Sequence, residues 1–111
     1  MDISTQRYKH CDLLKVVGRV DSFTAPKLAE TIATINKDEV FKIVIDMTGL
    51  EYMSSAGFRA LLVGQRNCKR YNRGEIALAS VPKRIYDAFE LTGFTPLFNI
   101  YPDVTAAVGS F

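Results

Sequence analysis

The sequence predicts one α/β domain whose mixed, mostly parallel β-sheet of about five strands is covered by about four α-helices. Segments rich in Val and Ile alternate along the chain with segments of helical period, which is the pattern of strand–helix–strand units. The 111 residues suffice for one domain only, and the apolar share of 48% and charged share of 23% are those of a globular chain. We therefore expect a single domain over residues 1–111.

The N-terminal part is expected to form a strand hairpin followed by a helix. Residues 3–9 and 11–17 have strand character, and residues 10–12 form the turn between them. Thr24 is a favoured residue type for a helix N-cap, and Pro26 is tolerated in a first helical turn. Apolar residues then recur at i, i+4 and i+7, as one buried helical face requires, at Leu28, Ile32 and Ile35.

The middle of the chain holds the clearest strand and the longest helix. Residues 41–45 are apolar enough for a central strand that is buried on both faces. Residues 48–53 are expected to form a loop. Ser54 or Ser55 then begins a helix that should run to about residue 72, where a cation and a glycine favour its end.

The C-terminal part is expected to contain two more strand–helix pairs. Residues 76–79 read as a strand, and Pro82 begins a helix that ends near residue 92. A short strand at 98–101 and a last helix at 104–108 follow. In such sheets functional groups gather just past the carboxyl ends of strands, which directs attention to the segment 46–57.

The helix from 54 to 72 is predicted to have two distinct faces. One arc should face the sheet, with two glycines that allow close approach; it comprises Gly57, Ala60, Leu61, Gly64, Cys68 and Tyr71. The opposite face is either a solvated surface or a contact surface for a partner, and it carries Arg59, Arg66, Arg70 and Arg73.

Phe58 and Leu62 lie outside the sheet-facing arc, one helical turn apart. Either a neighbouring helix covers them, or they form an apolar patch with a basic rim that suits protein binding. The sequence leaves both interpretations open.

Two hydroxyl groups, those of Ser54 and Ser55, stand where the strand-end loop meets this helix. Serine is a favoured N-cap, so capping alone explains them. A phosphate would also be tolerated there, because the helix dipole favours an anion by roughly 0.3–1 kcal/mol. Such a modification would add about −1.5 to −2 charges to an exposed surface and weaken a docked partner. On these residues alone, capping is the simpler interpretation.

Several classes of enzyme lack the residues they need. A serine nucleophile requires a base beside it, but the only histidine, His10, falls in the predicted hairpin turn. No Cys/His cluster has metal-ligand spacing, and no glycine-rich phosphate loop is present. Asp46 ends a central strand, as a receiver aspartate does, but without the acidic pair that holds magnesium. We expect it to accept hydrogen bonds from loop amides, and we expect no catalytic residues, metal or cofactor.

Charge and hydropathy limit the partners. The net charge of +2 is small for a nucleic-acid coat, and the arginine face lacks aromatic residues apart from Tyr71, which is expected to face inward. No apolar run approaches the roughly 18 residues of a membrane span, and the N-terminus does not read as a signal peptide. We expect a cytoplasmic protein with no nucleic-acid or membrane partner, in which Cys11 and Cys68 are free thiols.

Two segments resemble a known family. Residues 42–62, KIVIDMTGLEYMSSAGFRALL, resemble the signature of the STAS domain that bacterial anti-sigma factor antagonists carry. Residues 18–25, GRVDSFTA, resemble the exit from the second strand of that family. Chain length and predicted element order match the family over nearly the whole chain. The resemblance implies a STAS domain that acts as a regulator and not as an enzyme.

The resemblance also implies partners and site residues. Antagonists of this family bind an anti-sigma factor that is also a serine kinase, and so release a sigma factor. The kinase phosphorylates a serine at the start of the second helix, and a metal-dependent serine phosphatase reverses this. That serine corresponds to Ser55, with Ser54 as second candidate because it stands where the family motif has an aspartate. The implied partner-binding residues are Asp21, Ser54, Gly57, Phe58, Arg59 and Leu62.

Two further interpretations remain open. Asp21 resembles the family aspartate that lies near the acceptor serine, but it could equally cap its own loop. Some STAS domains serve instead as scaffolds, or as modules that regulate a phosphatase, in larger signalling complexes. The same Ser55 would serve in either setting.

Overall fold

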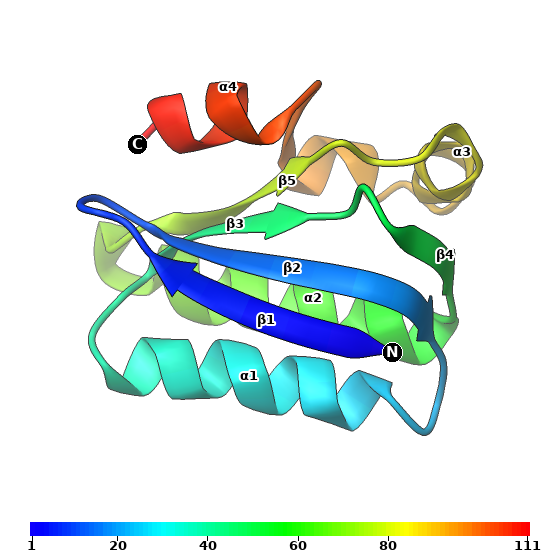
Figure 1. Ribbon diagram of the computed structural model, residues 1–111, viewed down its shortest axis with the longest axis horizontal. Coiled ribbons are helices and arrows are strands. Elements are labelled where there is room, and N and C mark those ends of the chain that lie inside the picture. The colour runs from blue at the N-terminus through cyan, green and yellow to red at the C-terminus, as the bar shows by residue number, and fades with distance from the viewer.

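The computed structural model describes all 111 residues and contains six strands and four α-helices (Figure 1). The main sheet has the strand order β1-β2-β3-β5-β6. β1 (Asp2–Arg7) is an antiparallel edge strand beside β2 (Asp12–Val20). The remaining neighbours run parallel, and they are β3 (Lys42–Asp46), β5 (Glu75–Ala79) and β6 (Asn99–Tyr101). The predicted α/β class and the mixed, mostly parallel sheet are confirmed.

The sixth strand, β4 (Leu50–Met53), pairs in parallel with the carboxyl end of β2. Leu50 lies opposite Gly18, and Met53 lies opposite Val20. The prediction of a loop over residues 48–53 is therefore wrong. In this strand only its first and last residues are buried, so its sequence lacks the alternation typical of a half-buried strand. Pairing with β2 decides its conformation.

The helices are divided between the two faces of the sheet (Figure 1). α1 (Ala25–Lys37) and α2 (Ser55–Lys69) cover one face side by side. α4 (Val104–Gly109) covers the other face over β3, β5 and β6. α3 (Lys83–Thr92) lies at the end of the sheet near β4. Short 3₁₀ turns follow α2 and α3, at Arg70–Asn72 and Thr95–Leu97.

α2 ends three residues earlier than predicted, at Lys69. Tyr71 and Asn72 have φ values of 59° and 56°, in the left-handed region that interrupts a right-handed helix. Tyr71 consequently turns outward and is 83% exposed. The expectation that Tyr71 faces the sheet is wrong, because it assumed that the helical period continues past residue 69.

The main core lies between the sheet and the pair α1 and α2. The predicted apolar face of α1 is buried there. α2 approaches the sheet closely at its glycines: a Cβ at Gly64 would lie 3.0 Å from Ile76 Cδ1. The close approach predicted from the two glycines of α2 is confirmed. Among the fully buried side chains on the strands and helices of this core are Leu14, Val16, Ile43, Ile45, Leu61, Cys68 and Phe89.

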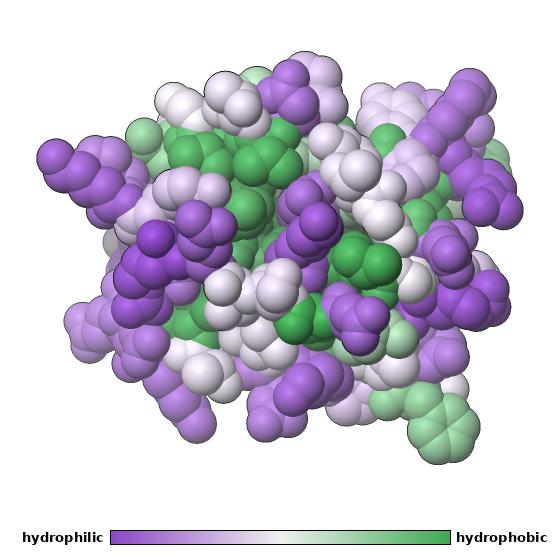
Figure 2. Space-filling view, in the orientation of Figure 1, coloured by the Kyte–Doolittle hydropathy of each residue, from purple (hydrophilic) through white to green (hydrophobic).

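A smaller core lies under α4 on the opposite face. It contains Cys11, Val44, Ala79 and Ala107, and partly buried hydrophobic residues such as Leu13 and Val108 rim it. Figure 2 shows apolar surface gathered between α4 and the strands on this side. Cys11 and Cys68 are both buried free thiols, as predicted, and burial raises the pKa of each. None of the helices is both long and apolar enough to cross a membrane.

Candidate functional site

The site begins at the turn that follows β3. The Asp46 carboxylate accepts hydrogen bonds from the Thr48 backbone N–H at 3.0 Å and from the Thr48 hydroxyl at 2.6 Å. The Leu50 N–H donates to the carbonyl of Met47 at 3.0 Å. The expectation that Asp46 accepts loop hydrogen bonds is confirmed. This turn directs the chain into β4 beside β2.

β4 carries the chain to the start of α2 and anchors it against β2. The Gly18 N–H donates to the carbonyl of Gly49 at 2.9 Å, and the Ser54 N–H donates to the carbonyl of Val20 at 2.8 Å. The start of α2 and the loop that leaves β2 therefore lie next to each other. Two segments more than thirty residues apart in the sequence form one surface at the carboxyl ends of the strands.

Asp21 organises the loop between β2 and α1. Its Oδ1 accepts hydrogen bonds from the N–H groups of Phe23 at 2.9 Å and Thr24 at 3.1 Å, and from the Thr24 hydroxyl at 3.1 Å. The bond from the Thr24 N–H is the main cause that holds the pKa of Asp21 below its ordinary value. Of the two interpretations of Asp21, the loop-capping role is the one with visible contacts.

The two serines have different environments. Ser54 is the N-cap of α2, but its side chain makes no capping hydrogen bond, and its Oγ is buried without a hydrogen-bond partner. Ser55 is the first residue of the helix and is exposed. Capping by a serine hydroxyl is therefore absent here. Only Ser55 presents its side chain to another molecule.

Gly57 and Phe58 are buried at the start of α2, although Phe58 also lines the groove between α2 and α3. A Cβ at Gly57 would lie 2.6 Å from Met53 Cγ and 2.8 Å from Val20 Cγ1. Phe58 is only 9% exposed, and its ring centroid lies 4.9 Å from that of Phe89 on α3. Gly57 therefore offers a partner no exposed surface, and the expectation that Phe58 contacts a partner stays a prediction, limited to the groove that it lines. A neighbouring helix covers Phe58, and both residues support the start of α2 from below.

Gln65 fixes α2 against the sheet and was missed in the sequence. Its Oε1 accepts from the Ile76 N–H, and its Nε2 donates to the carbonyls of Ile76 at 3.2 Å and Leu97 at 2.9 Å. The side chain is buried. Gln65 lies four residues after Leu61 and three before Cys68, so helical spacing places it on the sheet-facing arc. This spacing could have identified Gln65 from the sequence.

Two grooves meet at Ser55 and Arg59. One, of about 470 Å³, lies between α1 and α2 and is lined mainly by small apolar residues such as Ala25, Pro26 and Ala60. The other, of about 310 Å³, lies between α2 and the end of α3, where Phe58, Leu62 and Phe94 form its apolar walls. Ser55 and Arg59 line both grooves, and Arg59 is the only charged side chain that lines either of them.

The predicted site residues are thus partly brought together. Ser55, Arg59 and half-buried Leu62 share one surface, and Asp21 lies in the adjoining loop. Sequence reasoning missed the contribution of α1 to the first groove and of Phe94 to the second. It also missed Phe23, which is 91% exposed beside the groove residue Ser22. No periodic pattern in the sequence marks a loop residue of this kind.

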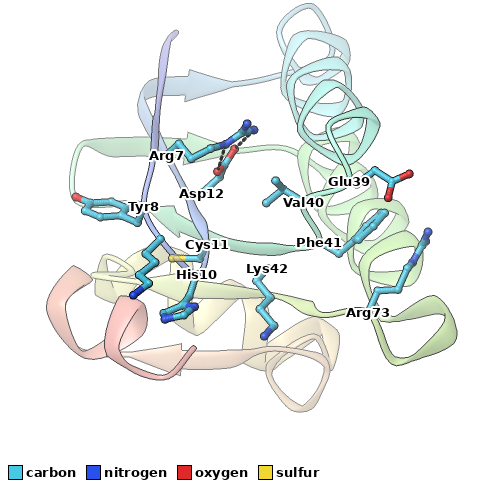
Figure 3. Close-up of a pocket in the computed structure, with 11 residues that line it drawn as sticks. Arg7, Tyr8, His10, Cys11, Asp12, Glu39, Val40, Phe41, Lys42 and Arg73 are labelled. Atoms are coloured by element: carbon cyan, nitrogen blue, oxygen red, sulfur yellow. Dashed lines mark hydrogen bonds and ion pairs between the residues drawn. The ribbon is translucent and has the colours of Figure 1, made fainter.

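A separate pocket of about 270 Å³ lies at the opposite end of the strands (Figure 3). Arg7 pairs there with Asp12 at 2.9 Å and also with Asp38, and hydrogen bonds with these carboxylates raise the pKa of Arg7. The Arg73 guanidinium lies 3.7 Å from the centroid of the Phe41 ring. Arg73 also donates to the carbonyl of Asn67 in the last turn of α2 and to that of Arg70, the residue that follows the helix. Arg73, which was predicted to lie on the exposed arginine face, therefore caps the C-terminal end of the helix.

Comparison with known proteins identifies the fold and the family. The family model of the STAS domain matches residues 2–107. The anti-sigma-B factor antagonist of Listeria monocytogenes is 30% identical over 100 residues, which are 90% of this chain and 86% of that protein. An anti-sigma factor antagonist from Mycobacterium paratuberculosis has a TM-score of 0.87 at 22% identity, covering 98% of this chain and 92% of the other. Bacillus SpoIIAA in its phosphorylated form has a TM-score of 0.77 at 15% identity, covering 98% of each chain.

The predicted resemblance is therefore confirmed over the sheet, the helices and the segment that contains Ser54 and Ser55. The sequence match covers most of the Listeria protein as well as most of this chain. This chain belongs to the STAS domain family, with anti-sigma factor antagonists among its relatives.

Proposed function

We propose that this chain is an anti-sigma factor antagonist that binds an anti-sigma factor with serine kinase activity, and so releases a sigma factor. Relatives that bear the name antagonist support the general role. The surface at the start of α2 is the proposed binding surface, with Arg59 and Leu62 at its centre and the Asp21 loop beside it. The role needs no catalytic group, and it belongs to the cytoplasm, where transcription is controlled.

Phosphorylation of Ser55 is the proposed control. The observation that carries it is the contrast between the two serines: Ser55 is exposed between two apolar grooves, whereas the Oγ of Ser54 is buried. SpoIIAA, which has this fold, is known in a phosphorylated form. The first turn of α2 contains no acidic residue, so a phosphate on Ser55 meets no like charge there.

The physical effect of the phosphate is electrostatic. It would add about −1.5 to −2 charges between two grooves whose walls are mainly apolar. A partner packed over them would have to desolvate this dianion, at about 3–4 kcal/mol, which weakens binding by roughly 200–1000-fold. A metal-dependent serine phosphatase would restore the binding form.

Phosphosite mapping of the protein from its own cells tests the control. Trypsin cleaves after Lys42 and Arg59, so both serines fall in the peptide 43–59, and fragmentation between them separates the two positions. We expect phosphate on Ser55 in a fraction of the protein that changes with growth or stress, and none in a Ser55→Ala strain. A peptide that stays unmodified in all conditions would contradict the switch and favour a scaffold or phosphatase-regulating role.

A further inference from the structure

We propose that Arg59 holds the phosphate of phosphorylated Ser55 in an ion pair within α2. The modification would then act twice: it adds a dianion to the binding surface, and it withdraws from a partner the cation at the centre of that surface. This inference rests on phosphorylation of Ser55, which is proposed above.

The positions of the two residues favour the pair. Ser55 is the first residue of α2, and Arg59 follows four positions later. Residues at i and i+4 of a helix are neighbours, with roughly 5–6 Å between their Cβ atoms, and an anion that precedes a cation is the better order. Both side chains are exposed and line both grooves, so they share the same surface. A phosphate on Ser55 would therefore lie within reach of the Arg59 guanidinium, one helical turn away.

Arg59 is available for this contact. The ion pairs of the structure use Arg7 and Lys83, and Arg59 takes part in none of them. No other charged side chain lines either groove. Among the charged groups near the start of α2, Asp21 accepts from Thr24, Arg84 on α3 donates to the carbonyl of Glu51, and the Arg19 guanidinium lies 4.4 Å from the centroid of the Tyr52 ring. Arg59 is therefore the one cation that lines the two grooves together with Ser55.

Arginine suits this role better than lysine. Its planar guanidinium donates two parallel hydrogen bonds to phosphate oxygens, whereas a lysine ammonium acts as a point charge. In the unmodified protein the two grooves carry one positive charge between them. After modification the paired group would carry about −0.5 to −1, so the sign of the surface is reversed.

The test is a ³¹P NMR titration of protein that carries phosphoserine at position 55, installed during translation so that no kinase is needed. The second pKa of phosphoserine is about 6. Arg59 stabilises the dianion, so this pKa should be lower in the parent than in Arg59→Gln by roughly 0.3–0.7 pH units. Arg59→Met should match Arg59→Gln, and the control Arg66→Gln, on the same helix, should match the parent. Equal values in the parent and in both Arg59 variants would overturn the proposal.

Salt supplies a second readout. The difference in the second pKa of phosphoserine 55 between the parent and Arg59→Gln should become much smaller as the salt concentration rises from about 0.05 to 1 M. The reason is that the pair is exposed and the Debye length falls to about 3 Å at 1 M. A difference that does not respond to salt would contradict an ion pair. The two proposals fail in different ways. The ion pair fails if the titration is unchanged by Arg59→Gln in protein that is known to carry the phosphate. The proposed function fails if Ser55 stays unmodified in cells.

Discussion

The backbone N–H of Ser54 donates to the carbonyl of Val20 across 2.8 Å, which joins the start of α2 to the end of β2. Below this bond, Gly57 packs against the side chains of Val20 and Met53. The position of Ser55 therefore depends on contacts between β2, β4 and the first turn of α2. Changes beneath the surface should act on stability, and changes on the surface should act on binding.

Gly57→Ala is expected to lower the free energy of unfolding by about 1–3 kcal/mol, because the added Cβ has no room beside Met53 and Val20. Urea denaturation measures the difference. Gly109→Ala in α4 is the matched control, since nothing lies within 4 Å of a Cβ there, and its stability should be unchanged or slightly higher. Equal stability of the two variants would contradict the close approach at Gly57.

Phe58→Ala is expected to lower the free energy of unfolding by about 3–5 kcal/mol, because its ring packs against Phe89 and Phe94. Leu62→Ala, at a half-buried position one turn later, should cost only about 1 kcal/mol. The same denaturation measurement compares them. If Phe58→Ala were no less stable than Leu62→Ala, Phe58 would be a surface residue and not part of the core.

Gln65→Leu is expected to lower the free energy of unfolding by roughly 2–4 kcal/mol. The leucine side chain has a volume similar to that of glutamine, but it leaves the Ile76 N–H and the Leu97 carbonyl without the hydrogen-bond partners that the amide supplies. Arg66→Gln, at the adjacent exposed position, should change stability by less than about 0.5 kcal/mol. A Gln65→Leu protein as stable as the Arg66→Gln protein would show that the amide does not hold α2.

Asp21 should make stability depend on acid pH. Its pKa is lowered from the ordinary value of 3.8, chiefly by the Thr24 N–H. A lowered pKa in the folded state gives stability that is present above the ordinary pKa and lost as pH falls through the folded-state pKa. Asp21→Asn keeps an acceptor oxygen but does not titrate. Thermal midpoints should therefore fall more steeply below about pH 4 in the parent than in Asp21→Asn; parallel slopes would count against the hydrogen-bonded carboxylate.

The sequence predicts the elements that have a long and regular pattern. The buried face of α1, the central strand β3 and the sheet-facing glycines of α2 all follow from periodicity, because each repeats a contact with the same neighbour. β4 does not follow from the sequence. It is four residues long, and its conformation depends on a partner strand thirty residues earlier in the chain.

For the same reason, the functional site could be predicted from the sequence only in part. Its location after β3 and its two serines are visible in the sequence, but the exposure of Ser55 and the burial of Ser54 Oγ depend on the tertiary packing around the start of α2. The cover over Phe58 comes from α3, thirty residues later. Tyr71 was misplaced because two left-handed residues, neither of them glycine, end the helix.

Binding of an anti-sigma factor serine kinase from the same organism tests the central claim most directly. Titration calorimetry would compare the parent with Ser55→Ala, Ser55→Asp and the charge control Ser4→Asp, which adds the same charge on the exposed edge strand β1. Ser55→Ala and Ser4→Asp should bind within a few-fold of the parent, and Ser55→Asp should bind roughly 200-fold more weakly or not at all. A Ser55→Asp protein that binds as tightly as Ser4→Asp would contradict the switch at Ser55.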